Sequence, residues 1–221
     1  MPILEKQMTT TVEQEVSIDV AGAQLRGDLI VPEQAFGLVL FADPCSRNRN
    51  GWDDRRIASE FEEQGLATLL FDLFISDEEE VRGGQEHTEA LADRWLAVAD
   101  WAGRQPDLAA FPLAFCGFGA AALAALVAAA RQPQSLGAVV CRDGRVDLMG
   151  GRLASVKAPT LLVVGAAESR LARAHEAALL RLGSPRKELV ILPNVPVDED
   201  RIDSIADLVG DWLGAQLIQL A

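Results

Sequence analysis

Phe115-Cys116-Gly117-Phe118-Gly119-Ala120-Ala121-Ala122 is the stretch that decides the fold of this 221-residue chain. Together with the apolar residues 111–114, its first residues suit a short strand buried on both faces of a sheet. The small residues from Gly117 to Ala120 suit a tight turn around Phe118, and residues 121–130 are typical of a helix. The sequence therefore predicts a strand, a cramped turn and a helix in immediate succession.

These three parts in this order are the parts of a nucleophile elbow. In such an elbow the turn residue projects its side chain above the sheet, beside the N–H groups of the helix. On the pattern G-x-S-x-G, Gly117 takes the first glycine, Gly119 the nucleophile and Ala121 the last glycine. The central side chain is then a hydrogen atom, so the sequence predicts an elbow without its reacting atom.

The rest of the chain alternates between strand-like and helix-like patterns. Strands are expected near Thr11–Val20, Gln24–Val31, Gly37–Ala42, Ala67–Phe71, Pro112–Cys116, Leu136–Cys141, Thr160–Val164 and Glu188–Leu192. Helices are expected at about Asp53–Gln64, Glu89–Arg104, Ala121–Arg131, Ala172–Leu182 and Arg201–Leu220. This order predicts a doubly wound, mostly parallel α/β sheet of about eight strands with helices on both faces. The first two strands form an antiparallel hairpin turning at Ala21-Gly22.

Composition narrows the classes of protein to which the chain can belong. No linker or repeat divides it, so one domain over residues 1–221 is expected. Its 20 Lys and Arg against 33 Asp and Glu give a net charge of −13, which argues against nucleic-acid partners. We find no signal peptide and no run long enough to cross a membrane, and we expect a cytoplasmic protein. Three scattered cysteines and two histidines predict reduced thiols, no metal site and no cofactor.

The whole pattern resembles the α/β-hydrolase superfamily, and most closely its small dienelactone hydrolase-like members, which have no large cap. The resemblance covers nearly the whole chain, and the order and spacing of its segments carry it. These segments are residues 27–32, 37–42, 67–73, the elbow at 115–122, 141–148 and 158–165.

This resemblance implies where the other catalytic positions should lie, because the triad partners follow in the order Ser, Asp or Glu, His. Glu168, just after the strand at 160–164, matches the acid position. Val197 stands where the loop after the last strand should carry the histidine, and valine cannot accept a proton. Asp43 and Pro44 stand where relatives carry a His-Gly pair beside the oxyanion donor, and proline has no N–H to donate.

Three altered positions together predict a natural loss of catalysis rather than a single inactivating change. Loss of triad members typically costs on the order of 10⁶ in kcat. The leading hypothesis is therefore a pseudo-enzyme that binds a small ligand or a protein partner in the old crevice, with Pro44, Trp52 and Phe118 as apolar lining. Further candidates for the lining of this pocket are Cys45, Cys116 and Arg142.

One alternative is a weak dienelactone hydrolase-like esterase, or a hydrolase that uses a thiol. Cys45, Cys116 and Cys141 all lie at or just beyond the ends of strands that the resemblance makes neighbours, so the thiols could gather near the old site. Burial as small apolar residues is the simpler interpretation for Cys116 and Cys141. Cys45, with Arg47 and Arg49 nearby, is the more accessible thiol.

Two further expectations concern charged groups and assembly. Glu168, without a histidine, is expected to pair with Arg142 at the end of the neighbouring strand or to face solvent. The acidic runs Asp77–Glu80 and Asp198–Asp203 lack the pattern of a calcium loop and suit solvated surfaces. The second alternative is a homodimeric scaffold joined through the last helix or an edge strand, although the apolar spacing of that helix is more often core.

Overall fold

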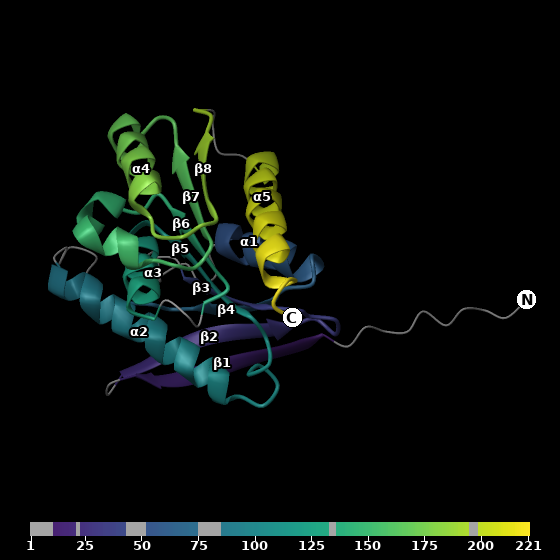
Figure 1. The fold of residues 1–221 in the computed structure, drawn as a ribbon. Coiled ribbons are helices and arrows are strands. Elements are labelled where there is room, and N and C mark those ends of the chain that lie inside the picture. The colour runs from purple at the N-terminus through teal and green to yellow at the C-terminus, as the bar shows by residue number, and fades with distance from the viewer. Residues whose placement is uncertain (1–10, 21–22, 43–51, 75–84, 133–135, 195–198) are drawn as a thin grey trace, which may run out of the picture.

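The computed structural model describes residues 11–20, 23–42, 52–74, 85–132, 136–194 and 199–221, and it has one eight-stranded sheet between two layers of helices (Figure 1). The strands are β1 (Val12–Val20), β2 (Ala23–Val31), β3 (Leu38–Ala42), β4 (Ala67–Phe71), β5 (Leu113–Phe118), β6 (Ala138–Arg142), β7 (Thr160–Gly165) and β8 (Lys187–Leu192). The helices are α1 (Trp52–Glu63), α2 (Gln85–Arg104), α3 (Gly119–Arg131), the 3-10 helix η2 (Val146–Ser155), α4 (Ser169–Arg181) and α5 (Glu199–Leu217).

The sheet confirms the predicted fold class. Its strand order is β1-β2-β4-β3-β5-β6-β7-β8. The pairs β1–β2 and β2–β4 are antiparallel, and every pair from β4 to β8 is parallel. The third, fifth and sixth strands are neighbours, as the resemblance implied. The expected turn of the hairpin, at residues 21–22, lies outside the described residues.

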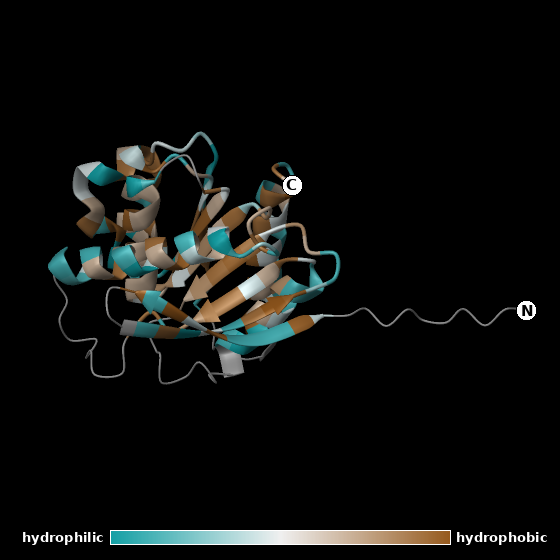
Figure 2. Cartoon of the chain, turned by 90° about the horizontal axis from the view of Figure 1, so that it is seen from below, coloured by the Kyte–Doolittle hydropathy of each residue, from teal (hydrophilic) through white to brown (hydrophobic). Residues whose placement is uncertain are grey.

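Central strands are buried on both faces, which explains their continuous apolar sequences. In β3, Leu40 packs in the core beneath α2 and α3, whereas Val39 and Phe41 pack in the core beneath α1 and α5. Hydrophobic residues follow the central strands and hydrophilic ones cover the outer helix surfaces (Figure 2). The sheet therefore separates two apolar cores, one on each side.

Helices α1 and α5 cover one face, and α2, α3 and α4 cover the other (Figure 1). The apolar side of α5 is part of the core, through Ile202, Ile205, Val209, Leu213 and Leu217. The Arg56 guanidinium on α1 binds Asp203 on α5, with Nη2 2.6 Å from Oδ2. The apolar spacing of the last helix thus reflects packing against the sheet rather than a free interface.

Most predicted elements match the observed ones within a few residues, but η2 was missed. Its sequence contains the pair Gly150-Gly151, which weakens any helical pattern, and Gly150 has a φ of +57° that kinks it. Helix α2 begins at Gln85, four residues before the expected Glu89. No described helix is both long and apolar enough to cross a bilayer.

Candidate functional site

The elbow itself has the predicted backbone. β5 ends at Phe118 and α3 begins at Gly119, whose φ of +54° lies in the left-handed region that glycine adopts without strain. A Cβ on Gly117 would lie 2.8 Å from the Ala122 nitrogen and 2.9 Å from the Ala121 carbonyl carbon. Only glycine therefore lets the start of α3 lie this close to the strand.

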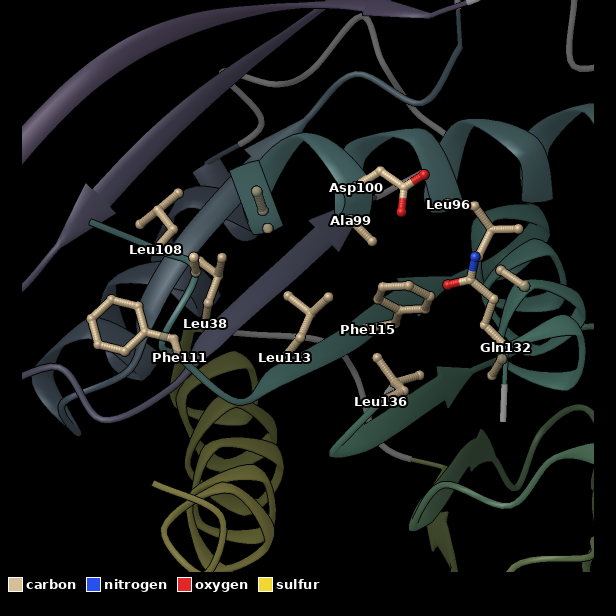
Figure 3. A pocket seen from close by; sticks show the side chains of 15 residues that line it. Leu38, Leu96, Ala99, Asp100, Leu108, Phe111, Leu113, Phe115, Gln132 and Leu136 are labelled. Atoms are coloured by element: carbon tan, nitrogen blue, oxygen red, sulfur yellow. The ribbon is translucent and has the colours of Figure 1, made fainter. Parts of the chain in front are cut away.

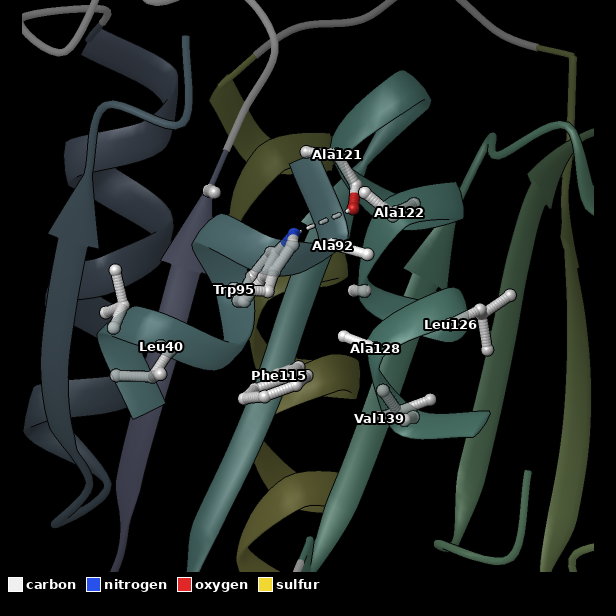
Figure 4. Close-up of a cluster of buried hydrophobic side chains, with 14 of the residues drawn as sticks. Leu40, Ala92, Trp95, Phe115, Ala121, Ala122, Leu126, Ala128 and Val139 are labelled. Carbon is white, nitrogen blue, oxygen red and sulfur yellow. Dashed lines mark hydrogen bonds between the residues drawn. The ribbon is translucent and has the colours of Figure 1, made fainter. Parts of the chain in front are cut away.

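Helix α3 is fixed beneath the elbow by its own small residues. Residues 121–129 are all buried, and Trp95 of α2 donates its Nε1–H to the Ala121 carbonyl at 3.2 Å (Figure 4). No side chain caps the start of α3, and its first turn has no acidic residue. The first N–H groups of a helix have no partner inside it, so the end of α3 at the elbow carries a partial positive charge.

Phe118, expected to line the crevice, is instead buried beside the elbow. Its ring meets Phe41 edge to face, with 5.1 Å between the ring centroids. The Arg142 guanidinium lies over the same ring, 4.8 Å from its centroid. Arg142 itself stays partly exposed, so it is the expected pocket residue that the structure places next to the elbow with some access to solvent.

The predicted ion pair between Glu168 and Arg142 is wrong. The Arg142 Nε lies 3.3 Å from Asp143 Oδ2 instead, and Glu168 is exposed at the start of α4. Asp143 can pair with Arg142 because it is the next residue in the chain and its φ is +54°. Aspartate tolerates this left-handed conformation better than most residues do. Glu168 therefore follows β7 as predicted and faces solvent, which confirms the other of the two expectations for it.

Sequence reasoning missed the part that Asp143 plays at this edge of the sheet. Its N–H donates to the Val163 carbonyl at 2.9 Å, and its Oδ1 accepts the Gly165 N–H at 3.1 Å. Asp143 thus links the end of β6 to the end of β7, just before Glu168, the predicted acid position. The signal in the sequence was an aspartate directly before Gly144 at the end of a buried strand, a pairing typical of turns.

His175 is not placed to act as a general base at the elbow. It is fully buried on α4, and its Nε2–H donates to the Gly144 carbonyl at 2.9 Å. Its Nδ1 is buried and has no hydrogen-bond partner among the described residues. Burial lowers the pKa of this imidazole, so the neutral form is favoured. The geometry makes His175 a structural contact between α4 and the turn after β6.

His87, the other histidine, lies in the first turns of α2. Its ring centroid is 6.0 Å from that of Phe74, which follows β4. His87 is half-buried, and its Nε2 is buried with no hydrogen-bond partner among the described residues.

The two described thiols do not gather at the site. Cys116 belongs to the core beneath α1 and α5, whereas Cys141 belongs to the core beneath α2, α3 and α4. They point to opposite faces because Cys141 is paired with Gly117 rather than with Cys116. Burial raises the pKa of both thiols, that of Cys141 to about 12. The expectation that Cys116 lines the pocket is therefore wrong, and burial as small apolar residues, the simpler interpretation, is confirmed for Cys116 and Cys141.

Several predicted site residues cannot be placed. Asp43, Pro44 and Cys45, which follow β3, and Val197, which follows β8, lie outside the described residues, as does the acidic run Asp77–Glu80. Trp52 begins α1, and its side chain is not described. Among the residues that the structure describes, no group of three or more His, Cys, Asp or Glu could hold a metal ion.

This fold and this elbow have a well-matched counterpart among solved structures. A dienelactone hydrolase from Anabaena variabilis superimposes with a TM-score of 0.85 at 36% identity, covering 94% of this chain and 99% of that chain. The chain belongs to the dienelactone hydrolase family.

Esterases with 16% identity share the family's fold. Est1E from Butyrivibrio proteoclasticus has a TM-score of 0.70 and matches 93% of this chain and 98% of its own. A cold-adapted esterase from an Arctic intertidal metagenomic library has a TM-score of 0.75 and matches 98% of this chain and 100% of its own.

Two curated relatives of this dienelactone hydrolase family member come from strains of Mycobacterium tuberculosis. Each is named a "putative phosphoribosyl transferase" and is 36% identical over 204 residues, which are 90% of this chain. The matched part of this chain spans about half of the length of these relatives, namely 46% of each. No protein-family profile matches the chain.

Proposed function

We propose that this member of the dienelactone hydrolase family has lost ester and lactone hydrolysis and binds a small ligand at the former catalytic edge. The observation that supports this most is Gly119. Its backbone retains the strained-turn geometry that presents a nucleophile, with a φ of +54°, but its side chain is a hydrogen atom. Nothing at that position can attack an acyl carbon.

The chain's histidines support the same proposal. Its two histidines are His87 and His175, and neither follows the last strand. His175 is buried with its Nε2–H bound to the Gly144 carbonyl, so it offers no general base to a substrate. Without nucleophile and base, a rate about 10⁶-fold below that of an intact triad is expected.

Ligand binding without turnover is supported by the charges that remain. The uncapped first turn of α3 and the partly exposed Arg142 both lie beside Gly119 and both favour negative charge. We therefore expect a small carboxylate or a lactone carbonyl to bind there. Thermal-shift measurements with a set of small carboxylates test this, and no stabilisation by any of them at millimolar concentration would count against it.

Restoring the missing groups tests the loss of catalysis. The wild-type protein should hydrolyse p-nitrophenyl acetate and a dienelactone no faster than heat-denatured protein does. The double variant Gly119→Ser, Val197→His should gain at least tenfold over wild type, because natural elbows tolerate serine in this conformation. Gly151→Ser is the matched control, since Gly151 is exposed on η2 and a Cβ there meets nothing within 4 Å.

Residual hydrolysis is the competing function, and the 36% identity to a dienelactone hydrolase favours it. It predicts that the wild-type protein turns over the lactone well above the denatured control. Such turnover, retained through purification to a single species, would contradict the proposed loss.

A further inference from the structure

A pocket lies between α2 and α3, at the opposite end of the strands from the elbow. Its volume is about 220 Å³. Its walls come from the first residues of β3 and β5, from Phe115, and from the facing sides of the two helices (Figure 3). Leu38 and Leu113 begin their strands here, whereas Phe118 ends β5 five residue steps after Leu113, roughly 16 Å away, and Gly119 follows it. The pocket is therefore separate from the former active site.

The pocket exists because α2 and α3 face each other through small side chains, which leave a space that larger side chains would fill. Ala99, Ala102 and Gly103 of α2 face Ala128 and Ala129 of α3 across the pocket. Apolar walls of this kind give water few partners, and a cavity of about 150 Å³ with similar walls is known to stay dry and to bind benzene. A volume of about 220 Å³ suits one ring with a short substituent.

Gly103 keeps the mouth of the pocket open. It is exposed near the end of α2, its φ is not in the left-handed region, and a Cβ there would meet nothing within 4 Å. Neither backbone conformation nor packing requires glycine, which costs a helix about 0.5–1 kcal/mol relative to alanine. The missing side chain leaves an entrance from solvent into the apolar space.

The mouth also carries a negative charge. Asp100 lies on the rim opposite the strands, with Gln132 at the end of α3 nearby (Figure 3). Asp100 is exposed and forms no ion pair with any described residue. An amine at the end of a ligand would find a carboxylate there, and the chain's net charge of −13 attracts cations in general.

We propose that this pocket binds a small arylalkylamine, with its ring among the leucine, phenylalanine and alanine side chains and its ammonium group beside Asp100. The apolar walls supply the affinity for the ring, and the carboxylate selects the amine over an uncharged or acidic end group. The site is independent of the elbow and of the function proposed for it.

Binding of 2-phenylethylamine to the full chain tests the proposal, with ethylbenzene and 3-phenylpropionate as uncharged and anionic counterparts. The carbon-13 methyl signals of Leu113 and Leu136 should shift with the amine, less with ethylbenzene and least with 3-phenylpropionate. Asp100→Asn should weaken binding of the amine about two- to fivefold, as expected for a partly solvated ion pair, and leave binding of ethylbenzene unchanged.

Gly103→Leu should close the mouth and reduce binding of both the amine and ethylbenzene at least tenfold. Gly151→Leu is the matched control, because its Cβ also meets nothing within 4 Å but lies on η2. Unchanged amine binding in Gly103→Leu would overturn the proposal, since the amine would then be held elsewhere on the acidic surface. Absence of methyl shifts at Leu113 and Leu136 in the wild-type protein would overturn it without any variant.

Discussion

Gly117 and Gly119 are small for different physical reasons, and the difference can be measured. At Gly119 the requirement is a positive φ, which serine also adopts at natural elbows at some cost. At Gly117 the requirement is space, because a Cβ at that position would lie within 2.9 Å of the backbone of Ala121 and Ala122. The first glycine thus maintains the fold of the elbow, and the second occupies the position on which the proposed loss of activity depends.

Gly117→Ala should lower the free energy of unfolding by about 1–3 kcal/mol, because backbone must move to admit the methyl group. Urea unfolding followed by circular dichroism measures this. Gly151→Ala, where space is open, should change stability by less than about 0.5 kcal/mol. Equal stability of the two variants would show that α3 does not lie as close to β5 as described.

His175 should make stability depend on pH on the acid side. Burial lowers its pKa in the folded state below the ordinary value of 6.5, so below that pH the unfolded chain binds a proton that the folded chain does not. The contribution of His175 to the free energy of unfolding is therefore complete above pH 6.5. It falls as the pH drops below 6.5, by up to about 1.4 kcal/mol per pH unit.

His175→Gln tests this pH dependence, because glutamine keeps an N–H donor for the Gly144 carbonyl but does not titrate. Its urea midpoint should fall less between pH 7 and pH 5 than that of the wild-type protein. In a His87→Gln background, the one remaining imidazole NMR signal reports the pKa of His175 directly. A pKa above 6.5 would contradict the burial argument.

At the scale of elements, Trp95 is the contact that ties α2 to the start of α3. It is fully buried, its ring packs against Phe71 and Phe115 at centroid distances of 5.0 and 4.8 Å, and its Nε1–H binds the Ala121 carbonyl. The elbow therefore depends on a helix that is distant in sequence.

Trp95→Phe should destabilise the protein by about 2–3 kcal/mol, through the cavity left by the smaller ring and the lost hydrogen bond. Trp212→Phe is the control, since the Trp212 Nε1–H reaches Glu188 Oε1 on the surface at 2.9 Å, and its loss should cost less than about 1 kcal/mol. Chemical denaturation measures the free energy of unfolding of both variants. Similar losses would mean that Trp95 is not a central packing residue.

Elements could be predicted from sequence because apolar runs and helical spacing are local signals. The strand at 160–164 and the elbow are examples, since each is indicated by its own residues. The placement of Cys116 and Cys141 could not be predicted, because strand register decides which residues share a face, and a shift of one residue reverses it. The partner of Arg142 was missed for a related reason, since it depends on the φ of Asp143.

At the scale of the whole molecule, the fold is that of the dienelactone hydrolase family, whereas the loss of its chemistry is our proposal. The strand order, the two cores and the 36% identity to a dienelactone hydrolase make the chain a member of that family. Fold membership alone does not specify a reaction, because function depends on the side chains placed at the site. The proposed loss of activity rests on Gly119 at the elbow and on the positions of His87 and His175, both of which precede the last strand.

Covalent labelling tests that central claim most directly. The wild-type protein would be incubated with a fluorophosphonate, which reacts with an activated serine, and its intact mass measured. We expect an unchanged mass, because Gly119 has no hydroxyl to phosphonylate. A stoichiometric adduct mapped to a serine would contradict it, since that serine would be a nucleophile activated in a site other than the elbow.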